Sequence, residues 1–201
     1  MKPALWALAF APIGYIAFQI YLLATGSPHA LGGEPGAAVM RLLGNTAWWA
    51  LILVLAITPL RQWWPALTPL VRARRLVGLW VSAYVVMHLL AYYLLVLGMD
   101  VSVLWDDISQ KPYAIAGFAA TLGLIPLTVT STRGWMRRLG RDWKRLHRIV
   151  YGVAFAAWIH VVWQVRSDYT EAVVFGLILL VLALLRAPTL RLHIHQLFLR
   201  N

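Results

Sequence analysis

The sequence of 201 residues contains no cysteine. This absence excludes disulfides, thiolate nucleophiles, iron–sulfur clusters and cysteine-based zinc sites. Charged residues are also scarce: they make up 12% of the chain against 61% hydrophobic residues, and the mean hydropathy is +0.71. A soluble fold of this length could not cover so much apolar surface, whereas helices about 20 residues long can expose it to lipid. The composition therefore predicts an all-α, polytopic membrane protein.

The motifs that accompany soluble nucleotide-binding or hydrolase domains are missing too. The chain has no G-x-G-x-x-G turn in a strand–helix–strand unit, no P-loop and no G-x-S-x-G elbow. It therefore cannot bind NAD(P)H in the usual way. An internal repeat of the kind found in many transporters is not visible either.

Six apolar stretches, each near or somewhat below the length that spans a bilayer, fill nearly the whole chain. They cover about residues 5–24, 44–60, 76–98, 112–130, 147–165 and 171–186. The last is the shortest, and it spans the membrane only if Glu171 and Arg186 snorkel or the bilayer thins. We predict a single transmembrane domain over residues 1–201, a bundle of six helices. The first stretch is expected to remain as an anchor, because no convincing cleavage site follows it.

The sign of the charges differs between the two sides of this bundle. If both termini are cytoplasmic, fifteen of the eighteen Lys and Arg residues lie inside and six of the seven Asp and Glu residues lie outside. The outer loops 25–43 and 99–111 are then short and contain glycine, proline and acids. Lys and Arg in short loops mark the cytoplasmic face, so orientation alone explains the net charge of +11. We therefore expect membrane lipid, and no nucleic acid, as the partner of these basic residues.

Two of the six histidines, His88 and His160, fall well inside predicted spans. An ionisable side chain at membrane depth usually faces the bundle interior with a partner. His88 follows Arg75 by thirteen residues and His160 follows His147 by thirteen, so each would lie ~20 Å from the cytoplasmic boundary. Two imidazoles at one depth could be the axial ligands of a b-type haem, whose apolar ring suits a bundle core. The alternative is that each is a neutral imidazole hydrogen-bonded to a neighbouring helix.

His147 leaves three interpretations open. It could ligate a second haem with an unidentified partner, orient a flavin, or cap its helix near the lipid headgroups. The position level with it on the third span is Arg75, a good partner for a propionate or a phosphate. Three aromatic residues near the level of His88 and His160 could pack a porphyrin, although Trp and Tyr are also enriched at membrane interfaces. These are Tyr84, Tyr92 and Trp163.

The remaining histidines carry less information. His193 and His195 alternate like a metal pair in the C-terminal tail, but two ligands do not close a zinc site. A tail that lies on the membrane surface is the simpler interpretation, and His29 lies in a loop.

Four segments, in this order, resemble a known family: "GNTAWWALILVLAITPLR", "RRLVGLWVSAYVVMHLLAYYLLVLG", "KPYAIAGFAATLGLIPLTVTS" and "WKRLHRIVYGVAFAAWIHVVW". Over about residues 40 to 165 they are similar to the MsrQ family, the haem-binding membrane subunits of bacterial periplasmic methionine-sulfoxide reductase systems. That family belongs to the ferric-reductase-like transmembrane superfamily. The histidine pattern after "WKRLH" is the most specific part of the resemblance.

The resemblance implies a multi-pass protein of the bacterial inner membrane that binds one or two b-type haems and FMN. It would take electrons from the quinone pool or a cytoplasmic flavin reductase. It would pass them to a periplasmic molybdopterin-dependent methionine-sulfoxide reductase subunit, its partner in a heterodimer, for repair of oxidised periplasmic proteins. The chain would then be an electron-transfer subunit rather than the catalytic subunit.

Carried over by position, the family's histidines fall on His88, His147 and His160. Arg75 and Arg148 are candidates to hold a haem propionate or a flavin phosphate. Superfamily members with two haems usually carry a second histidine on the third span. This chain has Arg75 or Val101 at the corresponding offsets.

Two other functions fit the same composition. One is a stand-alone transmembrane haem reductase acting on ferric iron, oxygen or quinone. The other is a small proton-coupled permease, which is disfavoured because the intramembrane acids of a proton path are missing.

Overall fold

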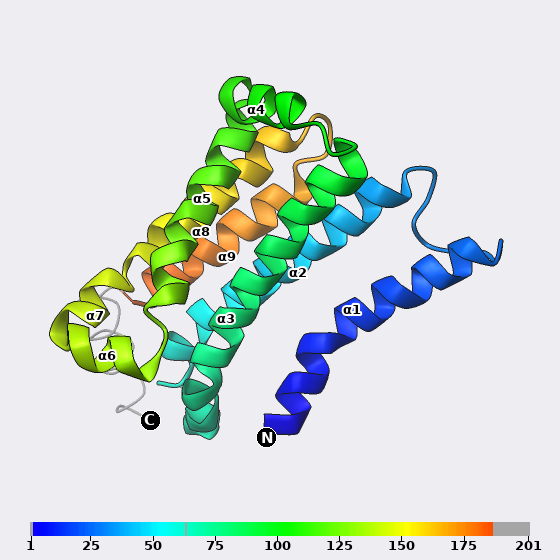
Figure 1. Cartoon of the computed structure of the whole chain (residues 1–201). Helices are drawn as coiled ribbons and strands as arrows, with labels where there is room; N and C mark the ends of the chain where they lie inside the picture. The colour runs from blue at the N-terminus through cyan, green and yellow to red at the C-terminus, as the bar shows by residue number, and fades with distance from the viewer. Residues whose placement is uncertain (1, 63, 187–201) are drawn as a thin grey trace.

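The computed structural model describes residues 2–62 and 64–186, and every regular element within them is helical (Figure 1). In chain order they are α1 (Lys2–Ala24), α2 (Pro35–Leu60), the 3-10 turn η1 (Pro65–Leu67), α3 (Thr68–Ala91), the π-helical turn η2 (Tyr92–Val96), α4 (Val101–Gln110), α5 (Pro112–Val129), α6 (Arg133–Leu139), α7 (Arg141–Leu146), α8 (Ile149–Gln164) and α9 (Thr170–Leu184). The all-α prediction is confirmed for these residues. His193 and His195 lie outside the described residues.

Among the residues that the structure describes, five helical segments are long and apolar enough to cross a membrane. They are Pro3–Ala24, Pro35–Leu60, Pro65–Val96, Pro112–Val129 and Arg141–Gln164. The chain is therefore a multi-pass membrane protein. The sixth predicted span corresponds to α9, whose 15 residues rise only ~22 Å against a hydrocarbon core of ~30 Å. The six-span bundle and the cytoplasmic position of both termini stay predictions.

The two ends of the bundle carry different helices. The start of α1, the short helices α6 and α7 and the end of α9 lie at one end of the bundle, and α4 lies across the other (Figure 1). Helices α6 and α7 carry basic residues in their last turns, which suits the end predicted to be cytoplasmic.

The outer segment 99–111, expected to be a loop, contains helix α4. Asp100 caps its N-terminus, because Oδ1 accepts hydrogen bonds from the backbone N–H groups of Ser102 at 2.8 Å and Val103 at 3.3 Å. Pro112 then ends the segment and begins α5 at a position where its missing N–H is not needed. The loop 25–43 is also shorter than expected, since α2 already begins at Pro35.

Two antiparallel helix pairs form the bundle: α2 with α3, and α5 with α8. One apolar cluster joins these four helices and α9. Its buried members include Trp48, Leu51, Leu55, Val81, Ala120, Leu124, Val153 and Phe175. Helix α1 lies at the edge, where the rings of Trp6 and Phe10 meet Trp80 and the Tyr84 hydroxyl donates to the Ala9 carbonyl at 2.6 Å.

Candidate functional site

Helices α3 and α8 place the imidazole rings of His88 and His160 next to each other. Their ring centroids are 6.5 Å apart and the ring planes are nearly perpendicular, at 87°. A metal ion that binds one nitrogen of each ring at ~2 Å, in line, would separate the centroids by about 6.3 Å. The separation of the two rings would therefore allow both imidazoles to hold one metal ion between them.

Each ring is held through its Nδ1 atom by a backbone carbonyl of the adjacent helix. His88 Nδ1 lies 2.9 Å from the Met40 oxygen on α2, and His160 Nδ1 lies 2.6 Å from the Tyr113 oxygen on α5. A carbonyl only accepts hydrogen bonds, so each Nδ1 carries the proton and donates. In the neutral ring Nε2 is then an unprotonated lone pair, which is the form that ligates metal. The hydrogen bond to a neighbouring helix and the ligand role thus use opposite sides of the same ring.

Two glycines, which sequence analysis missed, make room for these rings. A Cβ atom on Gly44 would lie 2.9 Å from His88 Nδ1, and one on Gly117 would lie 2.7 Å from His160 Nδ1. Any other residue at either position would collide with the imidazole or displace it. The donor set and this cradle fit a group ligated by His88 and His160.

The site is built twice on the same plan. In both helix pairs a carbonyl is followed one turn later by a glycine, and both face a histidine of the next long helix. His88 follows Met40 by 48 residues and His160 follows Tyr113 by 47. Only three positions correspond between the two copies, and the residue types match only at the glycine and the histidine. The repeat is therefore not visible in the sequence.

The aromatic residues expected around the site have different roles. The hydroxyl of Tyr84 holds α1, and the hydroxyl of Tyr92 donates to Asp107. Trp163 lines a hollow of about 450 Å³ together with Pro112 and Tyr113. Tyr113, which the sequence did not single out, places its ring centroid 6.1 Å from that of His160.

His147 lies at the other end of α8, where it caps α7. Its ring stacks on Trp143 with centroids 3.9 Å apart, and its Nδ1 lies 3.1 Å from the Trp143 oxygen. Its Nε2 is buried and makes no hydrogen bond of regular geometry, although the ring lies close enough to the Leu127 backbone to interact with it. A buried polar atom without such a hydrogen bond is disfavoured, so this nitrogen is available to a ligand.

The arginines near His147 do not lie as their sequence positions suggest. Arg75 and Arg148 are exposed. Arg74 is partly buried, donates to Thr58 Oγ1 at 2.6 Å, and is close enough for its charge to act on the His147 ring. Arg74, which sequence analysis did not single out, is therefore an arginine that can act at this second position.

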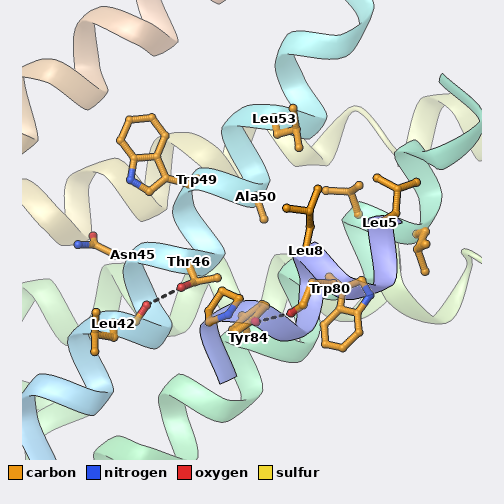
Figure 2. A pocket seen from close by; sticks show the side chains of 14 residues that line it. Leu5, Leu8, Leu42, Asn45, Thr46, Trp49, Ala50, Leu53, Trp80 and Tyr84 are labelled. Atoms are coloured by element: carbon orange, nitrogen blue, oxygen red, sulfur yellow. Dashed lines mark hydrogen bonds between the residues drawn. The ribbon is translucent and has the colours of Figure 1, made fainter. Parts of the chain in front are cut away.

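A groove of about 440 Å³ lies between α1, α2 and α3 (Figure 2). Its lining is mainly apolar, and exposed side chains such as Leu8, Trp49 and Leu53 form its rim. Asn45 and Tyr84 add polar groups. Asn45 directly follows Gly44, and Tyr84 precedes His88 by one turn, so this part of the groove adjoins the histidine site.

Comparisons with known proteins show what this chain is similar to. Residues 43–158 match the family described as "Ferric reductase like transmembrane component". The chain is 40% identical over 181 residues to proteins of Xanthomonas euvesicatoria pv. vesicatoria (strain 85-10) and Xanthomonas axonopodis pv. citri (strain 306). Both are named protein-methionine-sulfoxide reductase heme-binding subunit MsrQ, and the match covers 90% of this chain and 83% of each relative. No solved structure matches the chain.

Proposed function

Since the chain belongs to the ferric-reductase-like transmembrane family, with the MsrQ heme-binding subunits as relatives, we propose that it is a b-type cytochrome of the bacterial inner membrane. The observation that carries the proposal is the facing pair of His88 and His160, each held at Nδ1 and free at Nε2. When bound, a haem supplies a one-electron Fe(III)/Fe(II) couple at this place.

The residues around the site determine how such a group is held. His88 and His160 would be its axial ligands, from α3 and α8. The carbonyls of Met40 and Tyr113 fix the orientation of the two rings and raise the basicity of their Nε2 atoms. Gly44 and Gly117 let the backbones of α2 and α5 approach the rings. Two ligands on different helix pairs would also tie the two halves of the bundle together.

We infer that electrons leave at the end of the molecule that carries α4. The acceptor is a periplasmic molybdopterin-dependent methionine-sulfoxide reductase subunit that forms a heterodimer with this chain and repairs oxidised periplasmic proteins. The names of the relatives, heme-binding subunits of a protein-methionine-sulfoxide reductase, support a methionine-sulfoxide reductase as the acceptor. The acidic outer segment 99–111 would provide part of the docking surface, since basic residues gather at the opposite end.

The groove beside α1 supports the quinone pool, rather than a cytoplasmic flavin reductase, as the electron donor. Its rim of exposed apolar side chains opens to lipid, where a quinol with a long apolar tail resides. The polar residues Asn45 and Tyr84 line the groove (Figure 2), and Tyr84 precedes His88 by one turn of α3. Oxidation of the quinol to quinone releases two electrons and two protons.

Filling this groove should slow quinol oxidation. In the Leu53→Trp variant we expect a reduced quinol to reduce the purified protein at least about tenfold more slowly, because the larger side chain occupies the tail path. Stopped-flow absorbance measures that rate. Leu122→Trp on α5 is the matched control, since Leu53 and Leu122 are 47% and 48% exposed. Dithionite should reduce wild type and both variants equally. Equal quinol rates in all three proteins would contradict this donor site.

At the opposite end of α8, the buried Nε2 of His147 favours a ligand over a simple helix cap. We propose that His147 and the nearby Arg74 hold a second cofactor. The two candidates are a second haem, with the arginine on a propionate, and FMN, with the arginine on its phosphate. Arg75 and Arg148, which are exposed, stay candidates for the same anionic groups.

The first experiment is a reduced-minus-oxidised absorption spectrum of the detergent-purified chain, with extracted haem quantified per polypeptide. We expect a b-type spectrum with at least one haem. Two haems would assign the second to His147, and one would leave His147 to FMN. No haem, in cells supplied with ample haem, would overturn the proposed function.

Two further measurements separate the alternatives. Reoxidation of the reduced protein should be fast only when the periplasmic reductase subunit and methionine sulfoxide are both present. Equally fast reoxidation by ferric iron, oxygen or quinone alone would indicate a stand-alone reductase. Proton-coupled transport by a haem-free protein would indicate the permease.

A further inference from the structure

Asp107, on α4, is the only charged side chain that is buried within residues 3–62 and 64–186, with 5% of its surface exposed. The proposed function gives it no role. A buried carboxylate without partners would be strongly disfavoured, so the groups that contact the Asp107 carboxylate indicate its role.

Two side chains from other parts of the chain converge on this carboxylate. The hydroxyl of Tyr92, on η2, donates to Oδ2. The ammonium of Lys111, which precedes α5, lies 2.5 Å from Oδ1. Lys111 also interacts with the side chain of Tyr113. These four residues form a network across the end of the bundle where α4 lies, and we call it the outer polar network.

The outer polar network includes one residue that lies close to each histidine of the site. Tyr92 follows His88 by one turn on the continuous helix formed by α3 and η2. Tyr113 supplies the carbonyl that accepts the hydrogen bond from His160 Nδ1 at 2.6 Å. Asp107 therefore contacts a residue that lies one turn from His88, and Lys111 lies two residues before the one whose carbonyl holds His160.

The carboxyl and the ammonium are both charged at neutral pH. Burial alone would raise the pKa of Asp107, but the hydrogen bonds from Lys111 and Tyr92 hold it below its usual range. The hydrogen bond to Asp107 raises the pKa of Lys111. A fixed ion pair thus lies beside a site where the charge of the iron changes by one unit.

We propose that Asp107 and Lys111 are positioning residues that set the redox potential of the site between His88 and His160. This inference rests on the proposed haem function. The carboxylate favours the ferric state, the ammonium favours the ferrous state, and in the intact pair the two effects largely cancel.

The test removes one charge at a time and measures the midpoint potential by spectroelectrochemistry of the haem-loaded protein. Asp107→Asn leaves the ammonium unbalanced, so the potential should rise. Lys111→Gln leaves the carboxylate unbalanced, so the potential should fall. We expect the ratio of reduced to oxidised haem at a fixed ambient potential to change roughly threefold to tenfold in each case. Tenfold corresponds to about 59 mV for a one-electron couple.

The control is Asp106→Asn, which makes the same change of charge one residue away at an exposed position and should leave the potential nearly unchanged. Opposite shifts in the two network variants support the proposal. Shifts in the same direction, or a shift in the control as large as in Asp107→Asn, overturn it, since loosened packing does not depend on the sign of a charge.

The test stays decisive even if one of the two network variants fails to fold. If Asp107→Asn fails to fold, Lys111→Gln decides alone, because the Lys111 side chain is 46% exposed and its loss leaves no cavity. An unchanged or raised potential in that variant overturns the proposal. A wild-type protein that binds no haem would instead overturn the proposed function itself, so the two failures are distinguishable.

Discussion

Replacing His88 or His160 with alanine is expected to remove most of the haem from the purified protein. Each substitution would leave the iron with a single histidine ligand in an apolar site. The affinity for haem should fall by more than the 10–100-fold typical of losing an outer-shell partner of a metal ligand. Extracted haem per polypeptide, compared with the wild type, measures the loss.

Two other histidines serve as comparisons. His29→Ala should retain the wild-type haem content, since the His29 ring only accepts a hydrogen bond from the Leu31 N–H in an outer loop. His147→Ala should keep the haem held by His88 and His160 and lose at most a second cofactor. Full haem content in both the His88 and His160 variants would contradict the assignment. Complete loss in His147→Ala, with His88→Ala harmless, would mean that the ligands are paired differently.

The pairing of His88 with His160 could be predicted because a helix converts sequence distance into depth at a fixed rise per residue. Thirteen residues from the basic end of each span give the same height in the bundle. Depth does not give direction around the helix, however, since one residue changes the direction by 100°. This explains why Arg75, at the height of His147, is exposed while Arg74 approaches the ring.

The groups that hold the histidines could not be predicted. The Met40 and Tyr113 contributions are backbone carbonyls, which every residue has. Gly44 and Gly117 look like any other glycine of an apolar helix. Gly78 and Gly152 lie in comparable helices, yet a Cβ atom at either would meet nothing within 4 Å. Only the close approach of α2 to α3 and of α5 to α8 distinguishes the two pairs of glycines.

Asp107 was also missed, for a different reason. The excess of acids outside the membrane is explained by orientation, so each acidic residue of segment 99–111 was expected to be solvated. The Asp100 cap instead folds the segment into α4. In this helix Asp107 is buried while Asp106, its neighbour, is exposed.

A larger residue in place of Gly117 or Gly44 is expected to weaken haem binding strongly. Gly117→Ala should weaken haem binding about 10–100-fold, the range typical when the group that orients a metal-bound histidine is disturbed. The added Cβ would lie 2.7 Å from His160 Nδ1, closer than real contacts allow, so the ring must move away from the Tyr113 carbonyl. Gly44→Ala should act in the same way on His88, from a contact of 2.9 Å. Haem titration of the purified variants measures both affinities.

This loss should occur without loss of the fold. The colliding atoms belong to a side chain, which can rotate away in the haem-free protein, and alanine favours a helix over glycine by ~1 kcal/mol. The haem-free Gly117→Ala protein should therefore melt at the wild-type temperature or above it. Gly152→Ala, on α8 and without a neighbour within 4 Å, should bind haem normally. Normal haem affinity in both Gly44→Ala and Gly117→Ala would mean that the two imidazoles do not need their carbonyl partners to ligate iron.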